Sequence, residues 1–140
     1  MTSPSSDINA ATDTALRQAL AGFPQLELAL VFGSVARGTP RPDSDVDMAV
    51  ACRHRALTVR ETLDIVAALA QYTGRPVDLI DLHAVAPPLL NQIVRHGRRI
   101  LGNDAAYGRL ISRNLFDQAD FAPYRNRVLT ERRTAWMSSL

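Results

Sequence analysis

Residues 26–52 read LELALVFGSVARGTPRPDSDVDMAVAC, and this stretch decides the fold. Its first seven residues are mostly apolar and are bounded by Pro24 and Gly33, which is typical of a buried strand rather than of a helix of that length. Residues 38–44 combine Gly, Pro, Asp and Ser and predict a loop. Residues 45–52 predict a second strand. The stretch therefore favours two strands joined by a polar loop.

Helical signals flank these strands on both sides. The chain before them carries apolar residues at helical spacing as far as Gly22, with Ser5, Ser6 and Asp7 as candidate N-cap residues. After them, residues 58–72 have the apolar spacing of an amphipathic helix. The rest of the chain predicts, in order, a strand at residues 77–82, a helix from Pro87 to about Arg99, a short edge strand at Ile100 and Leu101, and a helical tail from Asp104 that bends near Pro123.

This order of elements predicts one α/β (α+β) domain, residues 1–140, built around a small mixed β-sheet with flanking helices. A chain of 140 residues with 46% hydrophobic content is long enough for one core and short for two. We expect residues 1–6 to be disordered. The helical tail, residues 104–140, is a candidate partner-binding surface, because its outer part from Phe121 to Trp136 mixes aromatic residues with arginines.

Composition argues against several classes of protein. The formal net charge of +2 is too balanced to indicate nucleic-acid binding, so we expect none. No apolar stretch approaches the ~20 residues that cross a bilayer, so we expect no membrane association. Cys52 is the only cysteine, which makes a reducing compartment, the cytoplasm, the simplest setting. The absence of a Walker sequence argues against a P-loop NTPase.

Aspartates interrupt the predicted strands where a core should prefer Val or Ile. Asp45 and Asp47 are two residues apart and project from one face if the segment is extended. Two close carboxylates do not both ionise cheaply unless a cation offsets their charge, and Mg²⁺ prefers such oxygen ligands. Asp78, on the next strand, would complete a two-metal site. The alternative is that Asp43 and Asp45 cap backbone N–H groups in a turn after Pro42.

Gly33 and Ser34 end the first predicted strand. A glycine at this point permits close approach of the backbone to another group. A following helix start would direct free N–H groups and the Ser34 hydroxyl toward phosphate oxygens. Arg37, in the same loop, offers either a phosphate contact or a surface salt bridge.

The sequence Gly33-Ser34, ten further residues and then Asp45-Val46-Asp47 resembles the signature of the DNA polymerase beta-like nucleotidyltransferase superfamily. The resemblance implies the fold of that superfamily, with Gly33 and Ser34 holding a nucleotide triphosphate. It also implies that Asp45, Asp47 and a third aspartate bind two Mg²⁺ ions. The third maps onto Asp78, which would also take the proton of the acceptor hydroxyl. Its competitor, Asp81, would lie on the opposite face of the strand.

The size of the chain and the stretch from Asp120 to Tyr124 are similar to the minimal nucleotidyltransferase antitoxins that are encoded with HEPN-domain ribonuclease toxins. This resemblance implies a protein that transfers AMP from ATP to a tyrosine of its partner toxin and so silences it. Two alternatives stay open: a small-molecule nucleotidyltransferase of the aminoglycoside-modifying kind, and a non-catalytic antitoxin that masks its partner. The nucleotide base, the number of AMP groups and the stoichiometry are also left open.

Overall fold

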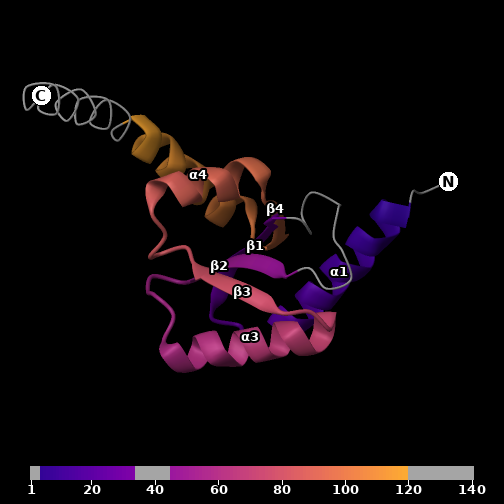
Figure 1. The fold of residues 1–140 in the computed structure, drawn as a ribbon. Helices are drawn as coiled ribbons and strands as arrows, with labels where there is room; N and C mark the ends of the chain where they lie inside the picture. The colour runs from indigo at the N-terminus through magenta and orange to yellow at the C-terminus, as the bar shows by residue number, and fades with distance from the viewer. Residues whose placement is uncertain (1–3, 34–44, 120–140) are drawn as a thin grey trace, which may run out of the picture.

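The computed structural model describes residues 4–33 and 45–119. They form a four-stranded sheet in the order β3-β2-β1-β4, covered by helices on both faces (Figure 1). β1 pairs antiparallel with β2 and β4, whereas β2 and β3 are parallel. The predicted small mixed sheet with flanking helices is confirmed. The strands are β1 (Leu26–Phe32), β2 (Val46–Cys52), β3 (Val77–Asp81) and β4 (Arg98–Leu101).

Within the described ranges, two helices pack on each face of the sheet. α1 (Pro4–Leu20) and α3 (Val59–Thr73) cover one face, and α4 (Pro87–His96) and a helix at residues 104–119 cover the other. Because successive side chains of a strand point to opposite faces, Met48 enters the first core and Ala49 enters the second. Asp47, two residues before Ala49, therefore faces the layer that contains α4.

The N-terminus of α3 is fixed by a capping box. Thr58 Oγ1 accepts a hydrogen bond from the Glu61 N–H at 3.1 Å, and the Glu61 carboxylate accepts one from the Thr58 N–H at 2.9 Å. Arg55 donates two hydrogen bonds to Glu61, at 2.6 and 2.8 Å, and these hold the pKa of that carboxyl well below its usual range. Gly74, in the left-handed conformation, closes the helix. The helix predicted at residues 58–72 is confirmed.

The helix α4 ends earlier than we predicted. It was expected to reach about Arg99, but it ends at His96, and Arg98 and Arg99 already pair with β1 as part of β4. Gly97 has extended backbone angles, and its N–H bonds the Ile93 carbonyl at 2.7 Å. A Cβ at Gly97 would overlap that carbonyl oxygen. Edge pairing with β1 therefore overrides the helical pattern of the arginines.

Helices lie near both ends of the chain, as the sequence predicted. α1 begins at Pro4, ahead of the three residues predicted to cap it, and it includes residues 4–6, which we expected from the sequence to be disordered. The predicted C-terminal helix is present at residues 104–119. The predicted bend near Pro123 and the surface beyond it lie outside the described residues.

Cys52 closes β2 and is fully buried, as expected of a small core residue. Burial, and after it the charge of Glu61, raise the pKa of the Cys52 thiol. The residue is therefore suited to packing rather than to thiolate chemistry. On the question of membranes, no helix within residues 4–33 and 45–119 has the length and apolar character that spanning a bilayer requires.

Candidate active site

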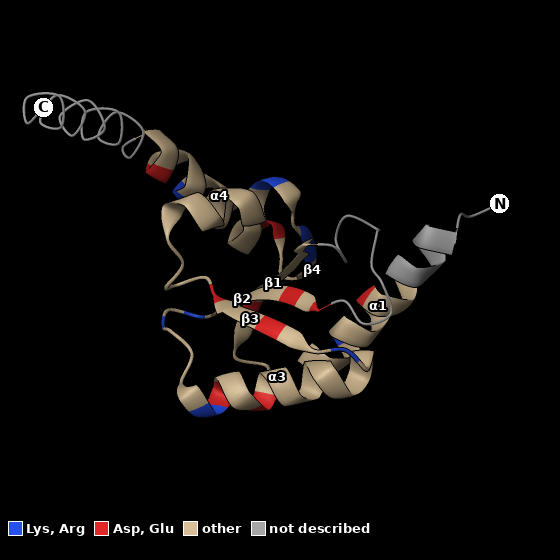
Figure 2. Ribbon diagram, in the orientation of Figure 1, with Lys and Arg blue, Asp and Glu red and all other residues tan. Residues whose placement is uncertain are grey.

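Asp47 and Asp78 are neighbours on adjacent parallel strands. They are register partners in the β2–β3 ladder, and partners in a ladder point their side chains to the same face. Asp47 is half-buried and Asp78 is exposed. Figure 2 shows acidic positions of β2 and β3 next to one another on the sheet. The fold thus brings together two predicted site residues that are far apart in the sequence.

Asp45 lies directly before this pair of strands. β2 begins at Val46, one residue later than predicted, and the Val46 N–H donates to the Pro76 carbonyl at 2.8 Å. This bond ties the start of β2 to the start of β3. Asp45 is exposed and precedes Asp47 by two residues. Asp45 is therefore at the same end of the sheet as Asp47 and Asp78.

Gly33 lies against Asp47. It directly follows β1, whose last residue, Phe32, is the register partner of Asp47. Its φ angle is +75°, and a Cβ built on it would overlap Asp47 Oδ2. Sequence reasoning assigned Gly33 to phosphate binding alone and missed this contact, because no sequence signal reports the register of β1 against β2. Ser34 and Arg37, the other two predicted nucleotide-binding residues, lie outside the described residues.

Asp81, the competitor of Asp78, has different surroundings. It is in register with Val50 and lies three residues beyond Asp78, so it faces the opposite layer of helices. Its carboxylate accepts hydrogen bonds from the Leu57 N–H at 2.7 Å and the His83 N–H at 2.9 Å. Asp78, by contrast, has no hydrogen-bond or ion-pair partner in the part of the chain described. Asp81 therefore joins two loops, and Asp78 is open to a ligand.

The donor groups at this end of the sheet suit a magnesium ion in kind, because carboxylate oxygens are the ligands that Mg²⁺ takes in proteins. In residues 4–33 and 45–119, however, no three His, Cys, Asp or Glu side chains are grouped closely enough to hold a metal ion. The described structure supplies the adjacent pair Asp47 and Asp78. A centre of three carboxylates that includes Asp45 stays a prediction.

Comparison with known proteins agrees with this arrangement. The family described as "Polymerase beta, Nucleotidyltransferase" matches residues 14–106, which include β1, β2 and β3. The chain belongs to this nucleotidyltransferase family. The predicted superfamily fold is thereby confirmed, and the segment matched contains Gly33, Asp45, Asp47 and Asp78.

One curated protein is similar to this chain over a large part of its sequence. The chain is 34% identical over 86 residues to the protein adenylyltransferase MntA of Shewanella oneidensis, which is 57% of this chain and 57% of that protein. The chain thus matches a little over half of the length of this relative.

Two solved structures share the fold. A toxin–antitoxin structure with AMP-PNP has a TM-score of 0.66 at 26% identity. The match covers 84% of this chain and 98% of the chain in that structure. A structure of the tri-AMPylated HEPN toxin of Shewanella oneidensis in complex with MNT antitoxin has a TM-score of 0.63 at 23% identity and covers 86% of this chain and 98% of its own.

Proposed function

We propose that this chain is an antitoxin that transfers AMP from ATP to a hydroxyl group, most naturally a tyrosine, of a HEPN-domain ribonuclease toxin and thereby neutralises it. Three observations on similar proteins support this function. The relative in Shewanella oneidensis is a protein adenylyltransferase, one similar structure contains the ATP analogue AMP-PNP, and another contains a tri-AMPylated toxin.

The observation that carries the proposal is the pairing of Asp47 with Asp78. Asp47 and Asp78 are adjacent carboxylates on one face of the sheet. Such groups repel each other unless a cation offsets their charge. A chain without a use for that cation gains stability from Val or Ile at both positions, because strands favour such residues. The pair is therefore best explained by nucleotide chemistry.

Each residue has a proposed role in the transfer. Asp45 and Asp47 would hold Mg²⁺, and Asp78 would complete the set. Bound Mg²⁺ supplies charge that stabilises the leaving pyrophosphate and lowers the pKa of the attacking hydroxyl. Gly33 and Ser34 would cradle the triphosphate, and Arg37 would contact a phosphate. Asp78, which is exposed, accepts the proton of the attacking hydroxyl as it approaches the α-phosphorus.

A reconstituted transfer reaction tests the proposal. The purified chain is incubated with ATP, Mg²⁺ and the toxin encoded beside it, and the intact mass of the toxin is measured. We expect the toxin to gain one or more adenylate groups and to lose ribonuclease activity. Asp47→Asn should abolish the gain, whereas Asp64→Asn, an exposed carboxylate on α3, should not. A toxin that keeps its original mass would refute the proposal.

The same reaction separates the two alternatives. Transfer of labelled AMP to an aminoglycoside in the absence of any protein partner would favour a small-molecule transferase. Neutralisation of the toxin by an Asp45→Asn, Asp47→Asn double variant that transfers no AMP would favour masking.

A further inference from the structure

Two cavities meet at the end of the sheet opposite to Asp47 and Asp78. The smaller one, about 190 Å³, lies between the sheet and the helix at residues 104–119, and the larger one, about 560 Å³, lies beside it. Along β2, the smaller cavity reaches Ala51, four residues beyond Asp47, which is about 13 Å away at ~3.3 Å per residue. The two cavities are therefore separate from the proposed catalytic end of the sheet.

The smaller cavity has an aliphatic floor. Five buried apolar residues line it: Leu28, Ala51, Leu82, Ala106 and Leu110. Among the described residues that line the two cavities, His83 is the only aromatic one, and its ring Nε2 is held at 2.8 Å from the Cys52 carbonyl oxygen, so the lining offers little of the stacking surface that a nucleic-acid base uses. This floor fits an aliphatic side chain better than a base.

The rim of the two cavities is rich in arginine. Arg109 lines both and forms an ion pair with Glu27, which also lines both, at 3.2 Å. Arg113, at the smaller cavity, donates to the Leu82 and Val85 carbonyls, which fixes its guanidinium at the rim. These contacts hold two cations at the mouth of an apolar cavity.

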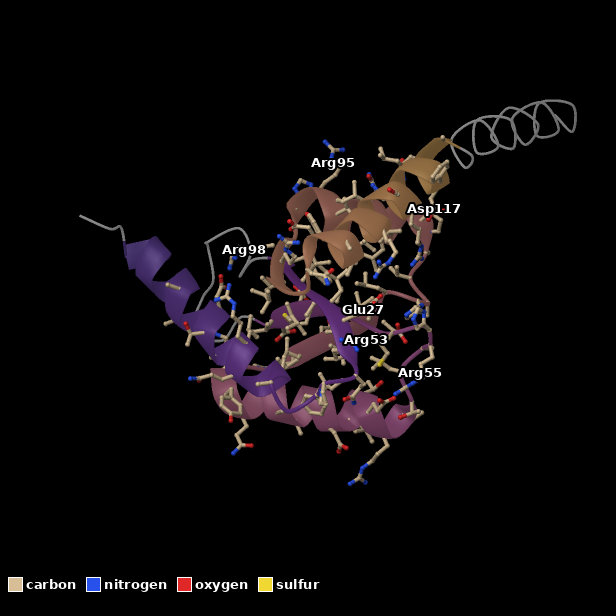
Figure 3. The ribbon with its side chains drawn as sticks, turned by 180° about the vertical axis from the view of Figure 1, so that it is seen from behind. Glu27, Arg53, Arg55, Arg95, Arg98 and Asp117 are labelled. Carbon is tan, nitrogen blue, oxygen red and sulfur yellow. The ribbon has the colours of Figure 1, made fainter. Side chains whose placement is uncertain are left out.

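Arg53 adds a cation without a partner. It is exposed, it lines the larger cavity, and its guanidinium has no hydrogen-bond or ion-pair partner among residues 10–33 and 45–119. Figure 3 shows Arg53 beside Glu27 at this end of the sheet. The rim therefore has an unneutralised positive charge within reach of the aliphatic floor.

We infer that these two cavities, hereafter the Arg53–Arg109 groove, form a docking site for an acidic segment of a protein partner that carries an aliphatic side chain. The aliphatic side chain would fill the smaller cavity, and a carboxylate beside it would pair with Arg53. Arginine around an apolar anchor is the composition of energetically important interface sites. Polyphosphate fits less well, because it has no apolar group to fill the aliphatic floor of the smaller cavity. The inference does not depend on AMP transfer.

A peptide titration tests the groove in the full-length chain. The probe is a fluorescein-labelled acetyl-Glu-Asp-Leu-Glu-Asp-amide, and binding is followed by fluorescence anisotropy and by amide NMR shifts. We expect shifts at Leu28, Ala106 and Leu110. Replacing the peptide leucine by glycine, or its acidic residues by lysine, should each weaken binding at least tenfold.

Variants of the chain provide the matched comparison. Arg53→Glu changes an exposed residue and should weaken binding at least tenfold while the unfolding midpoint stays unchanged. Arg60→Glu, at another exposed arginine, on α3, should leave binding unchanged. Shifts that map elsewhere, equal binding of the lysine peptide, or tighter binding of tripolyphosphate or of a thymidine oligonucleotide in the groove would each overturn the inference.

Discussion

The α-carbon of Gly33 lies so close to the carboxylate of Asp47 that a methyl group on Gly33 would overlap Asp47 Oδ2. Gly33 also has a φ angle of +75°, which side chains other than that of glycine rarely adopt. We therefore predict that Gly33→Ala displaces Asp47 from its register partner Asp78. AMP transfer should fall at least tenfold, and unfolding should require about 2 kcal/mol less. Transfer assays and urea unfolding measure the two effects.

Gly74→Ala is the matched control for this substitution. Gly74 has a φ angle of +68°, but nothing lies within 4 Å of the position where its Cβ would be. Gly74→Ala therefore introduces the conformational strain without a steric overlap. It should lower the free energy of unfolding by about 1 kcal/mol and leave AMP transfer unchanged. Equal loss of AMP transfer in both variants would show that the close approach of Gly33 to Asp47 is not required for transfer.

Asp78 and Asp81 should respond in opposite ways to removal of the carboxylate. Asp78→Ala removes an exposed group and should change the free energy of unfolding by less than about 0.5 kcal/mol while abolishing transfer. Asp81→Ala leaves the N–H groups of Leu57 and His83 without their acceptor and should destabilise the fold by about 2 kcal/mol. Transfer measured well below the unfolding midpoint should persist in Asp81→Ala. The reverse pattern would make Asp81 the third carboxylate.

Acid should weaken the fold through Glu61. Its pKa is lowered in the folded chain, first by the hydrogen bonds from Arg55 and then by that from Thr58. A lowered folded pKa means that the stabilisation is fully present above the ordinary value of 4.5 and is lost as the pH falls below it toward the folded pKa. Glu61→Gln should therefore narrow the difference in unfolding free energy between pH 7 and pH 3. Asp64→Asn, at an exposed ion pair, should leave it nearly unchanged.

Removal of magnesium should separate nucleotide binding from folding. We expect calorimetry to find ATP affinity that disappears when EDTA is added, because no Mg²⁺ then bridges the negative triphosphate and the negative carboxylates. The unfolding midpoint without nucleotide should not change with EDTA. Magnesium-independent ATP affinity in the parent chain, or unchanged affinity in an Asp45→Asn, Asp47→Asn variant, would contradict a metal-dependent site.

The sequence predicted the elements of the fold because their signals are local. The apolar spacing of residues 58–72 indicates α3, and the apolar run at Leu26–Phe32 marks β1. The end of α4 was wrong because the pairing of Arg98 with β1 depends on a strand far away in the chain. Propensity and spacing do not report such pairing.

The sequence proposes the residue types of the candidate site but does not specify their geometry. The Asp-x-Asp motif and its spacing from Gly33 indicated a candidate site at the start of β2. The register of Asp47 with Asp78, and the backbone contacts of Asp81, depend on how β2 and β3 align, which no local pattern specifies. The contact between Gly33 and Asp47 likewise depends on the register of β1 against β2.

The parallel arrangement of β2 and β3 has a consequence for control of the enzyme. Parallel neighbours need a crossover, and here the crossover is α3, so Asp47 and Asp78 sit at corresponding positions on either side of one helix. During synthesis, a chain whose β3 has not yet left the ribosome has the Asp-x-Asp motif of β2 but lacks Asp78. Ile65 and Leu69 of α3 pack in one core with Met48 of β2, and Leu79 of β3 packs against that core, so anything that detaches α3 from the sheet, a binding protein or a protease for example, removes packing beneath both aspartate-bearing strands without touching either aspartate.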